Sequence, residues 1–271
     1  MSTLAATARA LDAVHSRFGF DLVPEGPDWH PYPTLPVRLG EWAAELTGEG
    51  RAPSEVAMSL LSGVTGPVLR PLAVAWVLRA ELLAVDAATT AVRRRGRVTD
   101  RAALACAVRP ADPAELAERL AAMGTPIIDT LHRVTRYGRR NLWGGLGDVL
   151  SSHALWAGRH RGDPPVVLRA RFAEVQAVLD RVSAEVGAAF PRAEPFPLVG
   201  PERETVAQVR GTCCLHYRIP GRTHADGTPR YCGSCPLIDD EDRRVRMRPL
   251  VDEATTTART AHLGSPVAPP R

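Results

Sequence analysis

The chain has 271 residues, of which 45% are hydrophobic, and it carries a formal net charge of +4 with a pI near 9.0. This length and composition exclude disorder throughout and fit one large domain, or one domain with a small added module. All 34 basic residues are arginines, because the sequence contains no lysine. The charge excess is too small to indicate a nucleic-acid partner, and we expect none.

We expect no membrane span and a cytoplasmic location. The most apolar stretch, 71–85, is interrupted by Arg79 and Glu81 and is shorter than the ~20 residues that a span needs. The N-terminus lacks the apolar core of a signal peptide, because Asp12 and Arg17 soon follow a short Ala/Leu run.

The first 50 residues predict helices over 5–18 and 37–46, joined by a proline-rich loop. Helical signals then dominate from 52 to 187. Asp112-Pro113 supplies a capping oxygen and a first-turn proline, and Thr125-Pro126 predicts a new helix that Gly138 can end.

The clearest helix follows Asp163-Pro164, where apolar residues recur at steps of three and four. These are Leu168, Phe172, Val175, Leu179, Val182 and Val186. Between 91 and 108 the pattern is ambiguous, and 92–98 or 102–108 could form strands of a small sheet. The predicted fold class is therefore mainly α, or α+β with a small sheet.

The chain divides into four predicted segments. Residues 1–190 form a mainly helical domain, and prolines and glycines over 191–201 form a linker. A cysteine-rich module covers 202–250. Residues 251–271 are rich in Thr, Ala, Ser and Pro, have little to bury, and predict a flexible tail.

Four of the five cysteines, Cys213, Cys214, Cys232 and Cys235, fall within 23 positions. Four thiolates can hold zinc or an iron–sulfur cluster, because soft sulfur ligands suit both. Gly233 and Ser234 form a tight turn between the second pair, whereas the adjacent first pair converges only if the backbone bends. In zinc ribbons about two to four residues separate the two cysteines of each pair, so the adjacent pair favours an iron–sulfur cluster. A vicinal disulfide and ordinary buried thiols are the alternatives.

The remaining cysteine and two nearby histidines have simpler interpretations. Cys106 lies in an apolar run and is expected to be a small buried residue. His216 and His224 flank the cysteines, and we expect a hydrogen bond to a cluster sulfur from one of them in preference to metal ligation.

The run Cys213-Cys-Leu-His-Tyr-Arg-Ile-Pro220, followed by Cys232-Gly-Ser-Cys-Pro-Leu237, resembles the C-terminal signature of FhuF-type ferric-siderophore reductases. In that family a Cys-Cys pair, about ten residues and Cys-x-x-Cys bind a 2Fe-2S cluster. The resemblance implies that all four cysteines are its ligands. Here 17 residues separate Cys214 from Cys232. The additional entropic cost of closing this longer loop is only about 0.5 kcal/mol, because that cost rises slowly with loop length.

A weaker similarity lies upstream. Asn141-Leu-Trp-Gly-Gly145 resembles the Leu-Trp-Gly-Asn segment of the same family, with glycine where asparagine is usual. Trp143 is therefore a candidate platform for a siderophore, although an aromatic before two glycines is commonly a packing anchor. Arg244 and Arg246, in the basic run 243–248, are candidates to attract an anionic chelate or donor, with solvated arginines as the alternative.

The family resemblance implies a cytoplasmic enzyme that reduces Fe(III) in an imported siderophore, with hydroxamate chelates as the expected type. A ferredoxin or a flavin-dependent reductase is the implied electron donor. The alternative is a non-enzymatic interaction module in which the cysteines hold structural zinc. A relative of siderophore-biosynthesis ligases is a third hypothesis, although the chain is short for one and has no obvious nucleotide site.

Overall fold

The computed structural model describes residues 3–201, 203–219, 221–224 and 226–252. Helices make up 55% of the structure and strands 16%, which confirms the mainly α fold with small sheets. The α-helices are α1 (Leu4–Val14), α2 (Leu35–Gly48), α3 (Pro53–Arg79), α4 (Pro113–Thr135), α5 (Arg139–Arg161), α6 (Pro165–Glu185) and α7 (Asp240–Met247). The strands are β1 (Trp29–Pro31), β2 (Glu81–Ala84), β3 (Thr90–Arg95), β4 (Val98–Leu104), β5 (Ala107–Pro110), β6 (Glu194–Val199) and β7 (Glu204–Val209).

Helix α3 is the central helix of the core and packs against α5. It is long and apolar enough to cross a membrane by length and composition alone, and 83% of its most apolar window is buried within the fold. Gly145 permits the close approach of α5. A Cβ atom at this position would lie 2.7 Å from Met58 Cε and 3.0 Å from Leu61 Cδ2. Gly145 therefore serves helix packing.

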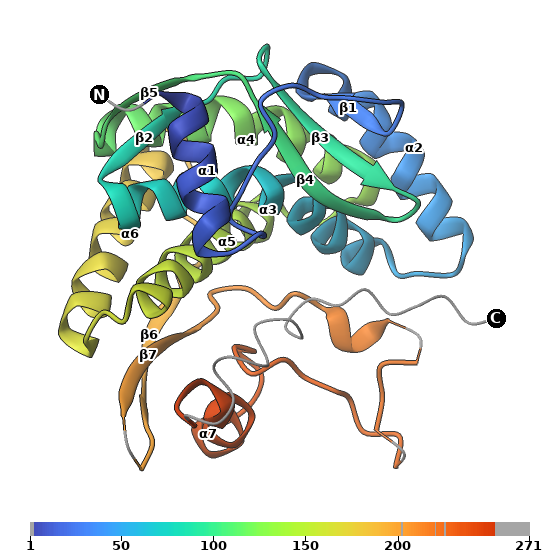
Figure 1. Cartoon of the computed structure of the whole chain (residues 1–271). Coiled ribbons are helices and arrows are strands. Elements are labelled where there is room, and N and C mark those ends of the chain that lie inside the picture. The colour runs from blue at the N-terminus through green and yellow to red at the C-terminus, as the bar shows by residue number, and fades with distance from the viewer. Residues whose placement is uncertain (1–2, 202, 220, 225, 253–271) are drawn as a thin grey trace.

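The small sheet expected between 91 and 108 is present. Strands β3 and β4 form an antiparallel hairpin that β1 extends, and β2 pairs with β5 in a second, two-stranded sheet. Gly96, with φ of 56°, occupies the turn of the hairpin. These strands cover one end of the helical core (Figure 1).

The helix boundaries agree with the sequence at some positions and differ at others. Asp112 caps α4 by accepting a hydrogen bond from Ala114 N, and α6 buries the predicted stripe as far as Val182. The expected restart at Thr125-Pro126 is wrong, because α4 continues through Pro126. The Ile127 and Ile128 side chains are fully buried there, and we attribute the continuity to this packing.

The expected linker over 191–201 contains a strand. Residues Glu194–Val199 form β6, which pairs with β7 along its whole length. Phe196 and Leu198 are buried, whereas Pro195 and Pro197 are exposed, as prolines can be in a strand that has only one partner. The β6–β7 hairpin and α7 lie on one side of the helical domain (Figure 1).

The hairpin is bonded directly to α5. Arg159 donates to Val206 O at 2.8 Å, and Gln208 donates to Asp148 O at 2.9 Å. Most of the predicted tail, 253–271, lies outside the described residues. Val251, at its start, is 3% exposed and packs against Phe196 of the hairpin.

Candidate metal centre

The backbone bends immediately after the adjacent cysteines. Leu215 has a left-handed conformation, with φ of 58°, and a short 3-10 helix, His216–Arg218, follows. The Leu215 N–H donates to Cys213 Sγ at 3.4 Å. The Leu215 side chain is buried in the main hydrophobic core. The bend required for Cys213 and Cys214 to share a site is therefore present and anchored.

The second cysteine pair is held by a tight turn and by α7. Cys235 N donates to Cys232 O at 3.1 Å. Arg243, only 3% exposed, donates from Nη2 to Cys235 O at 3.0 Å and to Ile238 O at 2.8 Å. The arginine thus fastens the turn to the first half of α7, where Asp240 is its ion-pair partner.

The four sulfur atoms approach one another in two pairs. Cys214 Sγ lies 3.9 Å from Cys232 Sγ, and the Cys213 and Cys235 thiols lie close enough to interact electrostatically. Two thiolates on one tetrahedral metal, each at about 2.3 Å, would lie roughly 3.8 Å apart, so the Cys214–Cys232 pair suits one metal atom. All four cysteines are free, which excludes a vicinal disulfide in this structure. Within the described ranges, no three His, Cys, Asp or Glu side chains are grouped as ligands of a single ion.

The thiols of the site have unequal acidities. A hydrogen bond from Cys232 lowers the pKa of Cys214, and the nearby His216 and Arg210 side chains lower it further. Burial of the thiol acts in the opposite direction. The same hydrogen bond and burial raise the pKa of Cys232. Burial raises the pKa of Cys213 to about 11. One thiolate of the Cys214–Cys232 pair is therefore favoured even without metal.

Asp148 of α5 anchors the segment that leads into Cys213. Its carboxylate accepts from Gly211 N at 2.7 Å, Thr212 N at 3.0 Å and Thr212 Oγ1 at 2.6 Å. Arg210 Nε lies 3.3 Å from the same carboxylate. Burial raises the pKa of Asp148, and these partners oppose the rise. The sequence analysis missed this residue. A single acidic residue among the Leu and Gly residues of a helix could have indicated a buried carboxylate with a structural role.

Two glycines permit the cysteine segment to lie close to the helical domain. A Cβ atom on Gly144 would lie 2.6 Å from Thr212 Cγ2, and one on Gly211 would lie 2.6 Å from the Arg192 carbonyl. The second contact is with backbone, which cannot move aside as a flexible side chain can.

We expect Gly211→Ala to displace the cysteine segment and to lower the free energy of unfolding by about 1–3 kcal/mol, as overpacking typically does. Gly40→Ala is the matched control. It lies in α2 with nothing within 4 Å, and it should stabilise by about 0.5–1 kcal/mol. Urea unfolding measures both. Equal stability of Gly211→Ala and the unmodified protein would contradict the close contact.

Trp143 is a packing residue. Its side chain is 4% exposed and stacks with Phe190 at a centroid distance of 6.0 Å. A Cβ atom on Gly124 would come within 2.7 Å of its ring. The predicted role as a siderophore platform is therefore wrong in this structure, because the ring has no surface to offer.

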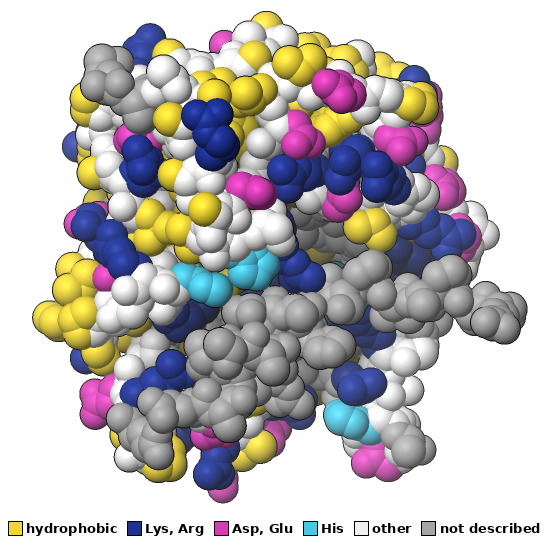
Figure 2. Space-filling model, viewed as in Figure 1, with side chains coloured by type: hydrophobic (Ala, Val, Ile, Leu, Met, Phe, Trp, Pro, Cys, Tyr) yellow, Lys and Arg dark blue, Asp and Glu magenta, His cyan; other side chains and the backbone are white. Residues whose placement is uncertain are grey.

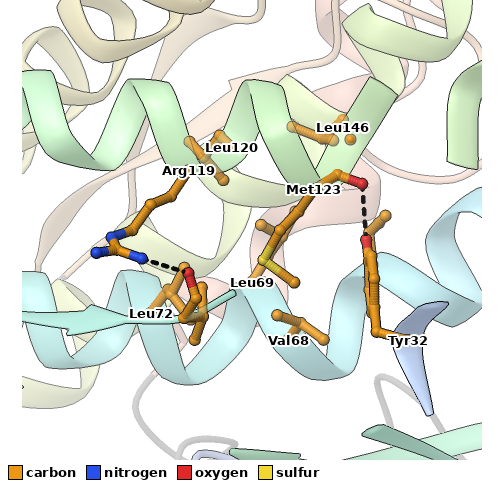
Figure 3. Close-up of a pocket in the computed structure, with 11 residues that line it drawn as sticks. Tyr32, Val68, Leu69, Leu72, Arg119, Leu120, Met123 and Leu146 are labelled. Carbon is orange, nitrogen blue, oxygen red and sulfur yellow. Dashed lines mark hydrogen bonds between the residues drawn. The ribbon is translucent and has the colours of Figure 1, made fainter. Parts of the chain in front are cut away.

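The adjoining core between α3 and α4 has no room for a ligand either. Its cavity measures about 10 Å³, close to the minimum that one water needs. Figure 3 shows Met123 and Leu120 lining it, with Tyr32 OH donating to Met123 O at 3.1 Å. This space is ordinary core packing.

The basic run 243–248 is not a continuous exposed patch. Arg243 is buried, and Arg246 donates to Tyr231 O at 3.1 Å and lies 3.9 Å from Asp242. Of the two arginines predicted to attract a substrate, Arg244 is exposed and Arg246 is half-buried, so only Arg244 is readily available to an anion.

Exposed arginines gather instead on the loop between Cys214 and Cys232. Arg230 N donates to Arg222 O at 3.2 Å, and His224 N to Thr228 O at 2.9 Å, so the loop folds back on itself. The Arg218, Arg222 and Arg230 side chains are exposed, and no ion pair joins them to a carboxylate in the described part of the chain. The loop is thus a basic surface attached directly to Cys214 and Cys232.

Cys106 and the two histidines that flank the cysteines occupy different environments. Cys106 is partly buried against the main core, and burial raises its pKa to about 11, as expected of a structural thiol. His216 lies close enough to Cys214 to lower the pKa of its thiol, whereas His224 is exposed on the loop.

An open hollow of about 590 Å³ lies elsewhere, between α1, residues 20–29 and the β3–β4 hairpin. Its Arg93 and Arg101 are paired with Asp100 and Asp21, respectively. On the face shown in Figure 2, arginines and carboxylates likewise lie side by side. No residue of the cysteine segment lines this hollow.

No protein-family model, no curated protein and no solved structure matches this chain. The resemblance to FhuF-type reductases therefore stays a prediction from the cysteine motif.

Proposed function

We propose that the protein is a ferric-siderophore reductase whose four cysteines bind a 2Fe-2S cluster. The observation that carries this proposal is the position of the sulfurs, with Cys214 Sγ 3.9 Å from Cys232 Sγ and the Cys213 thiol close enough to the Cys235 thiol to interact with it. A 2Fe-2S cluster needs two thiolates on each of two irons, and the donor set fits that need. The Leu215 N–H to Cys213 Sγ bond is of the kind that stabilises thiolate ligands.

When bound, such a cluster would take one electron from a ferredoxin or a flavin-dependent reductase and give it to the Fe(III) of the chelate. Hard oxygen donors hold Fe(III) better than Fe(II), so this electron weakens the siderophore complex. The chain's own part is to hold the sulfurs, through Asp148 and Arg243, and to bring an anionic partner near them. Hydroxamate chelates are the preferred substrates on the family resemblance, and a cytoplasmic location follows from the same proposal.

The decisive kinetic experiment mixes dithionite-reduced protein with a panel of ferric siderophores in the presence of a ferrous-specific chelator. Reoxidation of the protein and capture of Fe(II) should proceed together, with one Fe(II) for each electron lost. If no chelate reoxidises the protein faster than buffer, the substrate assignment is wrong.

The loop arginines should steer this encounter. We expect Arg222→Glu/Arg230→Glu to slow association with an anionic chelate or an acidic donor, most strongly at low salt, because exposed charges are screened within ~8–10 Å at physiological ionic strength. The control is Arg169→Glu/Arg181→Glu, which makes the same charge change on two exposed arginines of α6. Stopped-flow rates at several salt concentrations measure the effect. If both double variants slow association equally, the net charge of the protein is the cause and the loop has no specific steering role.

The alternative is a zinc-binding interaction module. The buried hydrogen bonds from Arg243 to Cys235 O and Ile238 O would stabilise a structural zinc site equally well. Metal analysis separates the two, since zinc gives a colourless protein.

A further inference from the structure

Arg210 is a buried cation beside the cysteines. It follows strand β7, its backbone N–H donates to Ser234 O at 2.9 Å, and its side chain is 15% exposed. Ser234 lies between Cys232 and Cys235 in sequence, so Arg210 joins the two halves of the site.

The guanidinium is only partly used by the protein. Nε faces the Asp148 carboxylate at 3.3 Å, whereas Nη2 is buried with no hydrogen-bond partner among the described residues. Buried donors without partners are rare, and each calls for a missing acceptor.

The charges around Arg210 indicate where that acceptor lies. Burial lowers the pKa of Arg210, but Asp148, Cys214 and Cys232 raise it, and the net change is upward. The Cys214 and Cys232 thiols therefore lie close enough to Arg210 to act on its pKa, which makes them the candidate acceptors for the unpartnered Nη2 donor.

We propose that Arg210 donates a charge-assisted hydrogen bond to the sulfurs of the cluster and raises its reduction potential. This inference rests on the proposed function. A cluster with four thiolates is anionic and gains a further negative charge on reduction, so a fixed adjacent cation stabilises the reduced form more than the oxidised form. Asp148 acts as a positioning residue, because it holds the guanidinium through Nε.

The test is a spectroelectrochemical titration of anaerobically purified protein. Arg210→Gln should make reduction at least tenfold less favourable, a shift of 59 mV or more to lower potential for a one-electron couple. Arg210→Lys keeps the charge and should recover most of that shift. The control is Arg161→Gln, which removes another ion-paired arginine, bonded to Asp163 and Val77 O, and should leave the potential unchanged.

The possible outcomes separate the two claims. A coloured Arg210→Gln protein with the unmodified potential would overturn the role of Arg210 and leave the cluster standing. If the glutamine variant holds no cluster but the lysine variant does, the charge requirement is supported. Loss of the cluster from both, with helical content retained, would overturn it. Unmodified protein that takes up zinc and no iron would overturn the proposed function itself.

Discussion

Replacing Cys214 or Cys232 singly by serine is expected to abolish the visible absorption of the purified protein. These two sulfurs lie 3.9 Å apart, so removal of either leaves one metal atom with an incomplete set of thiolates. Cys106→Ser is the matched control, because Cys106 packs against the main core and takes no part in the site. Absorption spectra and iron content measure the result.

The helical domain should survive loss of the cluster. The α6 stripe and its neighbours bury a core in which the ligand sulfurs have little part, so far-ultraviolet circular dichroism should change little in Cys232→Ser. Limited proteolysis should instead cut within 210–240, where we expect order to depend on the metal. A global loss of helix, or full colour in the serine variants, would contradict this assignment.

Asp148→Ala should lower the free energy of unfolding by about 3–5 kcal/mol, the usual cost of removing one partner from a buried ion pair. Arg210 would lose its carboxylate, and the N–H groups of Gly211 and Thr212 would lose their acceptor. Amide hydrogen exchange should therefore accelerate at these positions, and iron uptake should fall with it.

Asp180→Ala is the control for this prediction. Asp180 is also paired with an arginine, Arg192, but its side chain is 75% exposed. Exposed pairs contribute about 0–1 kcal/mol, so the stability should scarcely change. If both variants lose a similar free energy of unfolding, Asp148 does not anchor the cysteine segment.

The sequence was informative where local chemistry decides the structure. The capping Asp112, the apolar stripe of α6 and the tight turn at Gly233 depend on neighbours a few residues away, and each was predicted correctly. Pro126 misled because a local helix-stop rule was outweighed by burial of the residues that follow it.

The anchoring of the site could not be predicted in this way. Asp148 contacts residues 62–64 positions further along the chain, and no local pattern specifies such a pairing. Trp143 was ambiguous for the same reason, since the Gly124 and Phe190 contacts that bury it come from other segments. Arg243 belongs to a run for which solvated arginines were the alternative, and nothing in the sequence singles out Arg210. Only the fold reveals that their side chains, 4% and 15% exposed, lie beside the cysteines.

The most direct test of the central claim is the metal content of the protein purified without oxygen. We expect two iron and two acid-labile sulfide per chain, a visible charge-transfer spectrum, and loss of all three in Cys214→Ser. One zinc per chain in a colourless protein, unchanged by anaerobic supply of iron and sulfide, would contradict the cluster and favour the structural zinc module.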